Sequence, residues 1–287
     1  MESRTRQAPA KVNLALDILG RREDGYHDMR MVMQSISLCD IVTVQETEAG
    51  FTLHTDGDFI PAGKKTLEQR AAEVFFRVIG RPAPGLEVTL EKQTPAYAGL
   101  GGGSADVAAL LRILRDAYAP ELSTDELERI GFTVGSDMPF CVRGGTALAE
   151  GRGEILTDLP ALPDCWFVLC KPDFGIPTPM LFAQVDGGTL ERRPDIDGMM
   201  AALDAGDLDG IAARLGNVFE HVLPEEYHEV FVIKQRLLEL GALNAAMSGS
   251  GPTVFGIFRE FETAEKTLRM LKNTYEQTYL ACPVKRF

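Results

Sequence analysis

Hydrophobic and polar residues alternate near the start of the chain. Over residues 9–20, Val12, Leu14 and Leu16 share one face, while Lys11 lies on the other. Because successive side chains of a strand point to opposite sides, this period of two predicts a β-strand. Other apolar runs predict further strands, near 30–46, 51–55, 86–92, 140–149, 165–170, 243–247, 253–258 and 276–285.

A second periodicity, with apolar residues three and four positions apart, predicts helices. It covers 66–79 and returns over 107–118. Ser123 is expected to cap a short helix that runs through Arg129. The second half of the chain is predicted to be richer in helices, at 178–186, 195–216, 224–240 and 261–274. Helices and strands together predict an α+β fold.

Residues 150–165 are rich in Gly and Pro and precede a new apolar strand. Such a change in composition is typical of a domain boundary. The chain of 287 residues is also long enough for two domains. We therefore expect an N-terminal domain over 1–155 and a C-terminal domain over 156–287.

The formal net charge of −13 argues against nucleic acid or an anionic membrane surface as a partner. The cysteines, Cys39, Cys141, Cys165, Cys170 and Cys282, are odd in number and scattered. This pattern predicts reduced thiols in a cytoplasmic protein. The first residues carry no apolar stretch of the kind found in signal peptides, and no run is long enough to span a bilayer.

Candidate chemistry centres on the run P-A-Y-A-G-L-G-G-G-S-A-D, from Pro95 to Asp106. Four glycines in five positions allow backbone N–H groups to turn toward one anion, and a helix N-terminus after the loop adds unpaired N–H groups. The run predicts a phosphate cradle. A dinucleotide fingerprint is disfavoured because Ser104 stands where its third glycine is expected, and the chain has no Walker A loop. A flexible turn before a helix is the remaining alternative.

Other segments gain meaning beside this loop. The turn M-S-G-S-G-P-T, 247–253, is either a hairpin turn or a support for the same pocket. Lys11 is unusual in an apolar strand, where it either takes part in chemistry or extends its ammonium to solvent. Asp137 is either a catalytic acid or base or a turn cap. Tyr26 and His27, in a polar loop, are either packed on the core or recognise a base.

These segments together resemble the GHMP kinase superfamily, named for its galactose, homoserine, mevalonate and phosphomevalonate kinases. The matching runs are P-A-K-V-N-L, P-A-Y-A-G-L-G-G-G-S-A and M-S-G-S-G-P-T, in that order. D-G-Y-H, G-S-D-M-P-F and I-P-T-P are similar to one branch of it, whose acceptor is the 2-hydroxyl of 4-diphosphocytidyl-2-C-methyl-D-erythritol, an intermediate of non-mevalonate isoprenoid biosynthesis.

The resemblance implies a two-domain α+β fold with the active site in the cleft between the domains. It implies ATP as phosphoryl donor, Mg²⁺, a small-molecule acceptor, and a monomer or homodimer. It places Lys11 and Asp137 as the catalytic pair. It assigns ATP binding to Lys92, Pro95, Ala96, Tyr97, Ala98, Gly99, Leu100, Gly101, Gly102, Gly103, Ser104 and Ala105. Substrate binding falls to Asn13, Tyr26, His27, Thr178 and Phe182, with Tyr26 and Phe182 expected to sandwich cytosine.

Two positions depart from the family pattern. Thr66 stands where the family often has Asn at the start of a helix near adenine; it can still cap that helix. Ala105 offers no hydroxyl, so Ser104 is the candidate metal ligand. Another small-molecule kinase of this fold and a non-catalytic sensor that binds ATP remain the alternatives.

Overall fold

The computed structural model describes residues 3–56, 65–188, 190 and 192–286. Its Cα positions form two compact units that interleave along the chain. Unit 1 holds residues 1–10, 39–94 and 101–143; unit 2 holds 11–38, 95–100 and 144–287. Each unit is made of several separate segments, whereas the two domains expected from the sequence are continuous ranges. The expected boundary near residue 155 stays a prediction.

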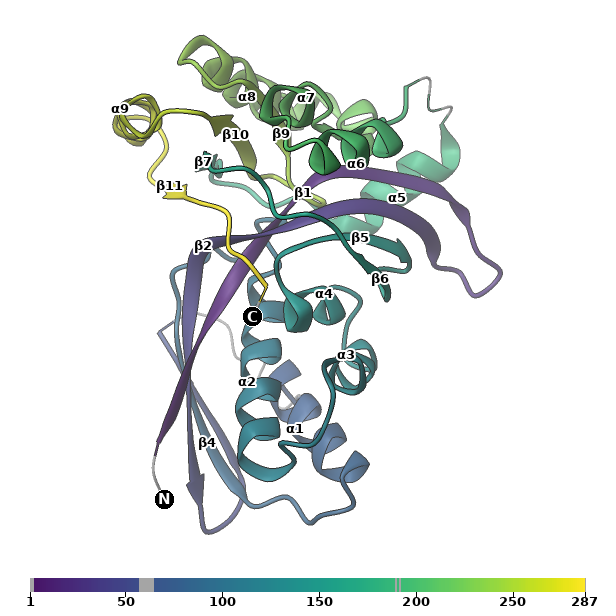
Figure 1. Cartoon of the computed structure of the whole chain (residues 1–287), viewed down its shortest axis with the longest axis vertical. Coiled ribbons are helices and arrows are strands. Elements are labelled where there is room, and N and C mark those ends of the chain that lie inside the picture. The colour runs from purple at the N-terminus through teal and green to yellow at the C-terminus, as the bar shows by residue number, and fades with distance from the viewer. Residues whose placement is uncertain (1–2, 57–64, 189, 191, 287) are drawn as a thin grey trace. The chain divides into compact units, whose positions relative to one another are not determined.

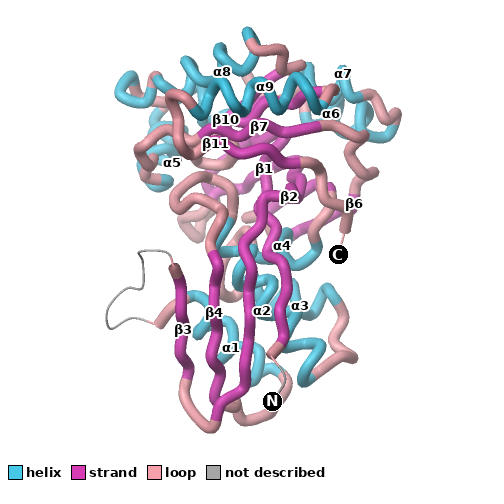
Figure 2. The backbone as a smooth tube through the Cα atoms, turned by 90° about the vertical axis from the view of Figure 1, so that its left-hand side faces the viewer, coloured by secondary structure: helices cyan, strands magenta, loops and turns pink. Residues whose placement is uncertain are grey.

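Unit 1 is a sheet with helices on one face (Figures 1 and 2). Its strands lie in the order β3-β4-β2-β1, with β2 antiparallel and β3 parallel to β4. The helices α1 to α4 pack against one another. The bounds are β1 Arg4–Arg21, β2 His27–Thr47, β3 Phe51–Thr55, β4 Gly85–Glu91, α1 Leu67–Val78, α2 Gly102–Tyr118, α3 Thr124–Phe132 and α4 Met138–Arg143.

Unit 2 contains the other ends of β1 and β2, which pair with β8 and β5, and a separate sheet β11-β7-β10-β9. Helices α8 and α9 pack on that second sheet. The remaining bounds are β5 Thr146–Gly151, β6 Ile155–Asp158, β7 Trp166–Cys170, α5 Thr178–Gly187, α6 Ile196–Asp204, α7 Leu208–Ala213, β8 Gly216–Asn217, η1 Val218–Val222, η2 Glu225–Tyr227, α8 Glu229–Glu239, β9 Asn244–Met247, β10 Val254–Phe258, α9 Phe261–Lys272 and β11 Thr278–Ala281.

The predicted caps are confirmed. The Thr66 hydroxyl accepts a hydrogen bond of 3.2 Å from the Gln69 amide at the start of α1. Ser123 caps α3 and forms a reciprocal capping box with Glu126. No disulfide joins any of the five cysteines, all of which lie among the described residues. Among the described residues, no helix has both the length and the hydrophobicity needed to cross a membrane.

Some predicted elements are wrong in detail. Residues 140–143, expected to begin a strand over 140–149, belong to α4, and the strand starts only at Thr146 after two glycines with positive φ. A short apolar run suits either a helix or a strand, so its periodicity could not decide between them. The helix expected over 195–216 is two helices, broken at Gly206, whose φ is +64°. Strand β6 lies inside the segment expected to be a linker.

Candidate active site

The glycine-rich run changes backbone direction repeatedly before α2. Gly99 and Gly101 have φ values of +74° and +69°, and Tyr97 also has a positive φ of 51°. Gly101 is the N-cap of α2, so the N–H groups of the first helical turn have no partner within the helix. The predicted order of loop and helix N-terminus is therefore present, with the geometry that suits a phosphate.

The second glycine turn, 247–253, packs directly against Gly99 in unit 2. The Ser248 hydroxyl donates to the Gly99 carbonyl at 3.0 Å. A β-carbon at Gly99 would lie 2.1 Å from the Ser248 carbonyl oxygen, so only glycine permits this approach. Asn217 holds the turn by donating to the carbonyls of Met247 and Gly249, at 2.8 and 2.7 Å. The expected supporting role of 247–253 toward the loop agrees with these contacts.

Lys11 joins the same group of residues. Its side chain is buried, with 3% of the residue exposed, so it does not extend its ammonium to solvent. The Nζ atom donates to Asn13 Oδ1 at 2.7 Å and to the Gly99 carbonyl at 3.0 Å. A buried ammonium is costly unless it is hydrogen-bonded. Within unit 2, Lys11 and Asn13 thus lie beside Gly99.

The predicted substrate-binding residues lie on three segments of unit 2. The His27 and Phe182 rings are stacked, with centroids 4.5 Å apart, and His27 Nε2 lies 2.8 Å from Asp186 Oδ1. Tyr26 is half exposed, and the Arg152 guanidinium lies 3.5 Å from its ring centre. Thr178, at the start of α5, donates to the Ser250 hydroxyl at 2.8 Å. Phe182 is therefore stacked on His27, and it also makes an edge-to-face contact with Phe219, with ring centroids 5.2 Å apart.

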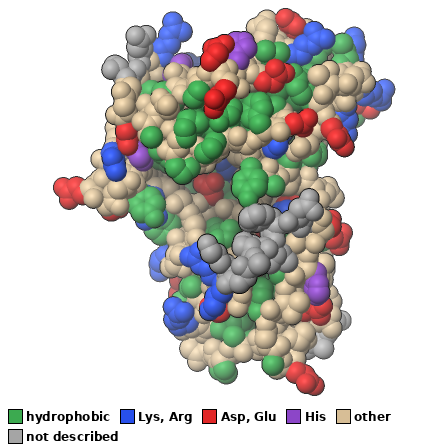
Figure 3. All heavy atoms as spheres, turned by 180° about the vertical axis from the view of Figure 1, so that it is seen from behind, with side chains coloured by type: hydrophobic (Ala, Val, Ile, Leu, Met, Phe, Trp, Pro, Cys, Tyr) green, Lys and Arg blue, Asp and Glu red, His purple; other side chains and the backbone are tan. Residues whose placement is uncertain are grey.

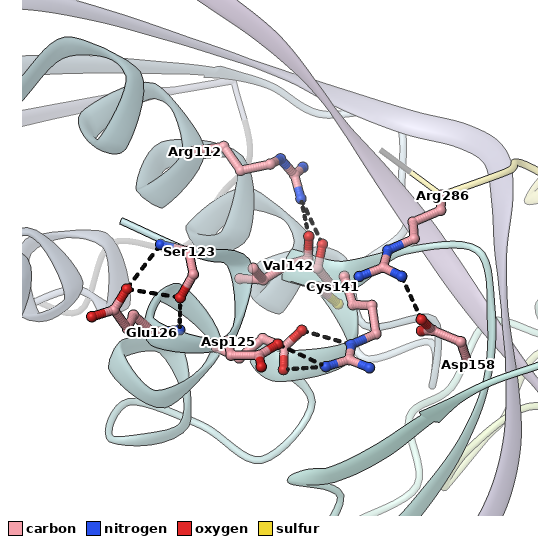
Figure 4. Close-up of polar contacts among 10 residues, drawn as sticks. Arg112, Ser123, Asp125, Glu126, Cys141, Val142, Asp158 and Arg286 are labelled. Atoms are coloured by element: carbon pink, nitrogen blue, oxygen red, sulfur yellow. Dashed lines mark hydrogen bonds and ion pairs between the residues drawn. The ribbon is translucent and has the colours of Figure 1, made fainter. Parts of the chain in front are cut away.

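Asp137 directly precedes α4 in unit 1, and Figure 4 shows how that helix is held. The Arg112 guanidinium, on α2, points at the last carbonyls of α4 and donates to Cys141 and Val142 at 2.7 and 3.3 Å. Arg143 pairs with Glu128 of α3 at 2.7 Å. Burial lowers the pKa of Arg112 to about 10, so it stays protonated near neutral pH. The C-terminal end of α4, the helix that Asp137 precedes, is thereby fixed to α2 and α3.

A buried ionic cluster that the sequence reasoning missed lies beside the start of α2. Lys92 Nζ donates to Asp40 Oδ2 and to Asp106 Oδ2. Asp40 and Asp106 are 0% and 2% exposed. Asp106 Oδ1 and the Thr94 hydroxyl are buried and have no hydrogen-bond partner among the described residues. We call Asp40, Lys92 and Asp106 the Lys92 cluster.

Electrostatics within the Lys92 cluster follow from its burial. Burial, opposed by the charge of Lys92, raises the pKa of Asp106 to about 7. Burial lowers the pKa of Lys92, but the two carboxylates outweigh it, and the net direction is upward. Lys92 therefore keeps its positive charge near neutral pH. Asp106 is then present both as the neutral acid and as the carboxylate, in comparable amounts.

Sequence signals for this cluster existed only in part. Asp40 has the same strand parity as Leu38, Val42 and Val44, all buried, so it lies on the core face of β2. A carboxylate on the core face of a strand needs a partner, so the position of Asp40 in the strand pattern was the signal that could have indicated the cluster. Asp106 gave none, because α2 is buried over every position from 105 to 114.

Magnesium is the metal that the sequence led us to expect. Within the described residues, no group of three or more His, Cys, Asp or Glu side chains is arranged to hold a metal. Ser104 lies in the first turn of α2 and offers one hydroxyl oxygen. Mg²⁺ prefers oxygen ligands and usually keeps waters while substrate phosphates supply other ligands. The residues present fit that mode of binding, with few protein ligands.

Comparison with known proteins agrees with this geometry. Residues 66–145 match the GHMP kinases N terminal domain, and residues 199–277 match the GHMP kinases C terminal family. A crystal structure of 4-(cytidine 5'-diphospho)-2C-methyl-D-erythritol kinase superposes with a TM-score of 0.81 at 32% identity, covering 98% of this chain and 99% of that one. Homoserine kinase from Cytophaga hutchinsonii, at 18% identity and a TM-score of 0.76, covers 100% of this chain and 96% of its own and shares the fold.

The fold and the domain matches define a GHMP kinase, a small-molecule kinase that uses ATP as phosphoryl donor. Among relatives, 4-diphosphocytidyl-2-C-methyl-D-erythritol kinase of Moorella thermoacetica is 45% identical over 97% of this chain and 98% of its own. The protein of that name from Listeria monocytogenes is 42% identical over 96% and 94%. The chain belongs to the 4-diphosphocytidyl-2-C-methyl-D-erythritol kinase family.

Proposed function

We propose that the protein transfers the γ-phosphate of ATP to the 2-hydroxyl of 4-diphosphocytidyl-2-C-methyl-D-erythritol, in the non-mevalonate route to isoprenoid precursors. The observation that carries the proposal is the buried Lys11 ammonium, bonded to the Gly99 carbonyl of the glycine-rich run. A buried cation beside a phosphate cradle suits phosphoryl transfer, which depends on positioning and charge neutralisation.

Asp137 is the proposed general base, which accepts the proton of the attacking hydroxyl. Lys11 offsets negative charge that develops on the transferred phosphoryl group. The amides of Gly101 to Ala105 hold the phosphates at the N-terminus of α2, together with Pro95–Leu100 and Lys92. Mg²⁺ supplies further charge neutralisation when bound, and Ser104 is its proposed protein ligand.

The acceptor side is proposed to be Asn13, Tyr26, His27, Thr178 and Phe182. The stacked His27 and Phe182 rings support a site for a flat base, because aromatic faces attract one another in offset stacks. Asp186 Oδ1, 2.8 Å from Nε2 of His27, fixes the orientation of the ring in this proposal. Cytosine is expected to stack between Tyr26 and Phe182. For Tyr26 to stack on it by the face that Arg152 covers, the Arg152 guanidinium must move away from that face.

We further propose that the enzyme is cytoplasmic, acts as a monomer or homodimer, and binds neither nucleic acid nor membranes. Charge supports the last point: the net charge is −13, and Figure 3 shows acidic and basic side chains interspersed on one face. We also keep, as a proposal, an ATP-binding domain over 1–155 and a second domain over 156–287.

A coupled assay of ADP release tests the function with a panel of acceptors that includes the diphosphocytidyl compound, homoserine and mevalonate. We expect the highest kcat/KM for the diphosphocytidyl compound by several orders of magnitude. Turnover of homoserine or mevalonate at a comparable kcat/KM would point to another kinase of the fold. ATP binding without turnover of any acceptor would point to a sensor.

A further inference from the structure

The Lys92 cluster joins three separate segments of unit 1. Asp40 lies on β2, Lys92 follows β4, and Asp106 lies in the first turns of α2. Asp40 Oδ1 also accepts from the amides of Gln93 and Thr94, at 2.6 and 2.7 Å. One buried carboxylate therefore fixes both the Lys92 ammonium and the backbone that follows it.

Close packing ties the same segment to the phosphate loop. A β-carbon at Gly102, the first residue of α2, would lie 3.0 Å from the Thr94 methyl and 3.7 Å from Asp40 Oδ2. Asp106 is four residues further along the helix, about one turn. The position of Lys92 and the position of the first turn of α2 are thus set by the same contacts.

The two carboxylates have different partners. Both oxygens of Asp40 are hydrogen-bonded, whereas Asp106 bonds Lys92 through Oδ2 and its buried Oδ1 has no partner in the described part of the chain. Two buried carboxylates around one ammonium are a poor stabilising device, because desolvation offsets the attraction. Lys92 itself keeps 23% of its side chain exposed, whereas the two carboxylates are buried.

We propose that Asp40 and Asp106 are positioning residues that hold Lys92 against the start of α2 and so preorganise the ATP side of the site. The inference rests on the proposed function, in which Lys92 lies beside ATP. An ammonium has three donors, and two of them are used by the carboxylates. The third is then aimed at the nucleotide rather than free to rotate.

The variant Asp106→Asn tests this with the smallest change in shape. We expect calorimetry with a non-hydrolysable ATP analogue and Mg²⁺ to give about tenfold weaker binding, the scale of a charge-assisted contact. KM for ATP rises in parallel while kcat stays within about twofold. If Asp106→Asn acted only by removing a negative charge near the phosphates, it would tighten binding of the analogue rather than weaken it.

Three further measurements separate positioning from general damage. Asp116→Asn removes a carboxylate further along α2 that pairs with Arg6 and Arg115, and it should leave analogue binding unchanged. The free energy of unfolding of Asp106→Asn should not fall below that of the wild type. In a Lys92→Met background, Asp106→Asn should cost less than about twofold, because it acts through Lys92.

Unchanged or tighter binding by Asp106→Asn overturns the inference, as does an undiminished effect in the Lys92→Met background. Failure of the proposed function is recognised separately. If the wild type binds the analogue but phosphorylates no diphosphocytidyl acceptor, the acceptor assignment falls, while the binding data on Asp106 still decide the inference.

Discussion

Lys11 shows how a single residue acquires a role from its surroundings. Its ammonium is buried and donates hydrogen bonds to the Asn13 amide oxygen and to the Gly99 carbonyl, among its other contacts. These contacts fix the position of the ammonium, which is what its proposed role toward a phosphoryl group requires. The proposed partner in chemistry, Asp137, is held by a helix whose far end is capped by Arg112.

Asp137→Asn is expected to lower kcat by at least about 10²-fold, the usual scale for a lost general base. The amide cannot accept the hydroxyl proton, although it has nearly the same shape. Steady-state turnover gives the result. Asp125→Asn, an exposed carboxylate near the start of α3, is the matched control and should retain full activity. Turnover by Asp137→Asn close to the wild-type rate would remove Asp137 from the mechanism.

His27→Ala is expected to weaken binding of the diphosphocytidyl acceptor by about tenfold or more, through loss of a stacked ring and a hydrogen bond. Affinity for an ATP analogue should stay within about twofold. Calorimetric titration of each ligand measures both. His54→Ala, a half-exposed histidine paired with Glu87, is the control. Equal losses for the two ligands would count against base recognition by His27.

Residues with a special backbone or a known motif were predictable from sequence, and their partners were not. The glycine-rich run and Lys11 stand out because glycine clusters and strand lysines are uncommon. Asp40 and Asp106 bond Lys92 across 52 and 14 positions, and Asp186 meets His27 across 159. Such pairings depend on how strands and helices pack, which no local pattern records.

At the scale of elements, strands with clear alternation and helices with clear caps were predicted well. β1 and α1 are examples. The failures concern short apolar segments and breaks: α4 was expected as strand, and Gly206 divides a helix that the pattern joined. In both places the secondary structure is determined by glycine conformation and by packing rather than by the periodicity of apolar residues.

Gly99→Ala tests the contact between the two glycine turns. It should lower the free energy of unfolding and the activity together, because its β-carbon would collide with the Ser248 carbonyl. Gly206→Ala has a similar positive φ but nothing within 4 Å of the new carbon, so it should cost only about 1 kcal/mol from backbone strain. Urea unfolding and turnover measure both variants. Equal losses would mean that close approach at Gly99 is unimportant.

At the scale of the whole molecule, the chain matches its relatives over nearly their full length, including both GHMP kinase regions. The fold and the class of kinase could be predicted from the order of three short sequence runs, P-A-K-V-N-L, P-A-Y-A-G-L-G-G-G-S-A and M-S-G-S-G-P-T. The acceptor depends on a few side chains of unit 2, so it is the part of the account that most needs a direct chemical test.

The most direct test is the ³¹P NMR spectrum of the product made from ATP, Mg²⁺ and 4-diphosphocytidyl-2-C-methyl-D-erythritol. Carbon 2 of this acceptor bears the methyl group, so its hydroxyl is tertiary and the carbon carries no proton. We predict a new phosphomonoester signal that shows no three-bond coupling to a carbinol proton. A signal coupled to such a proton, which marks a phosphate on a primary or secondary hydroxyl, or the absence of any new phosphomonoester, would contradict the account.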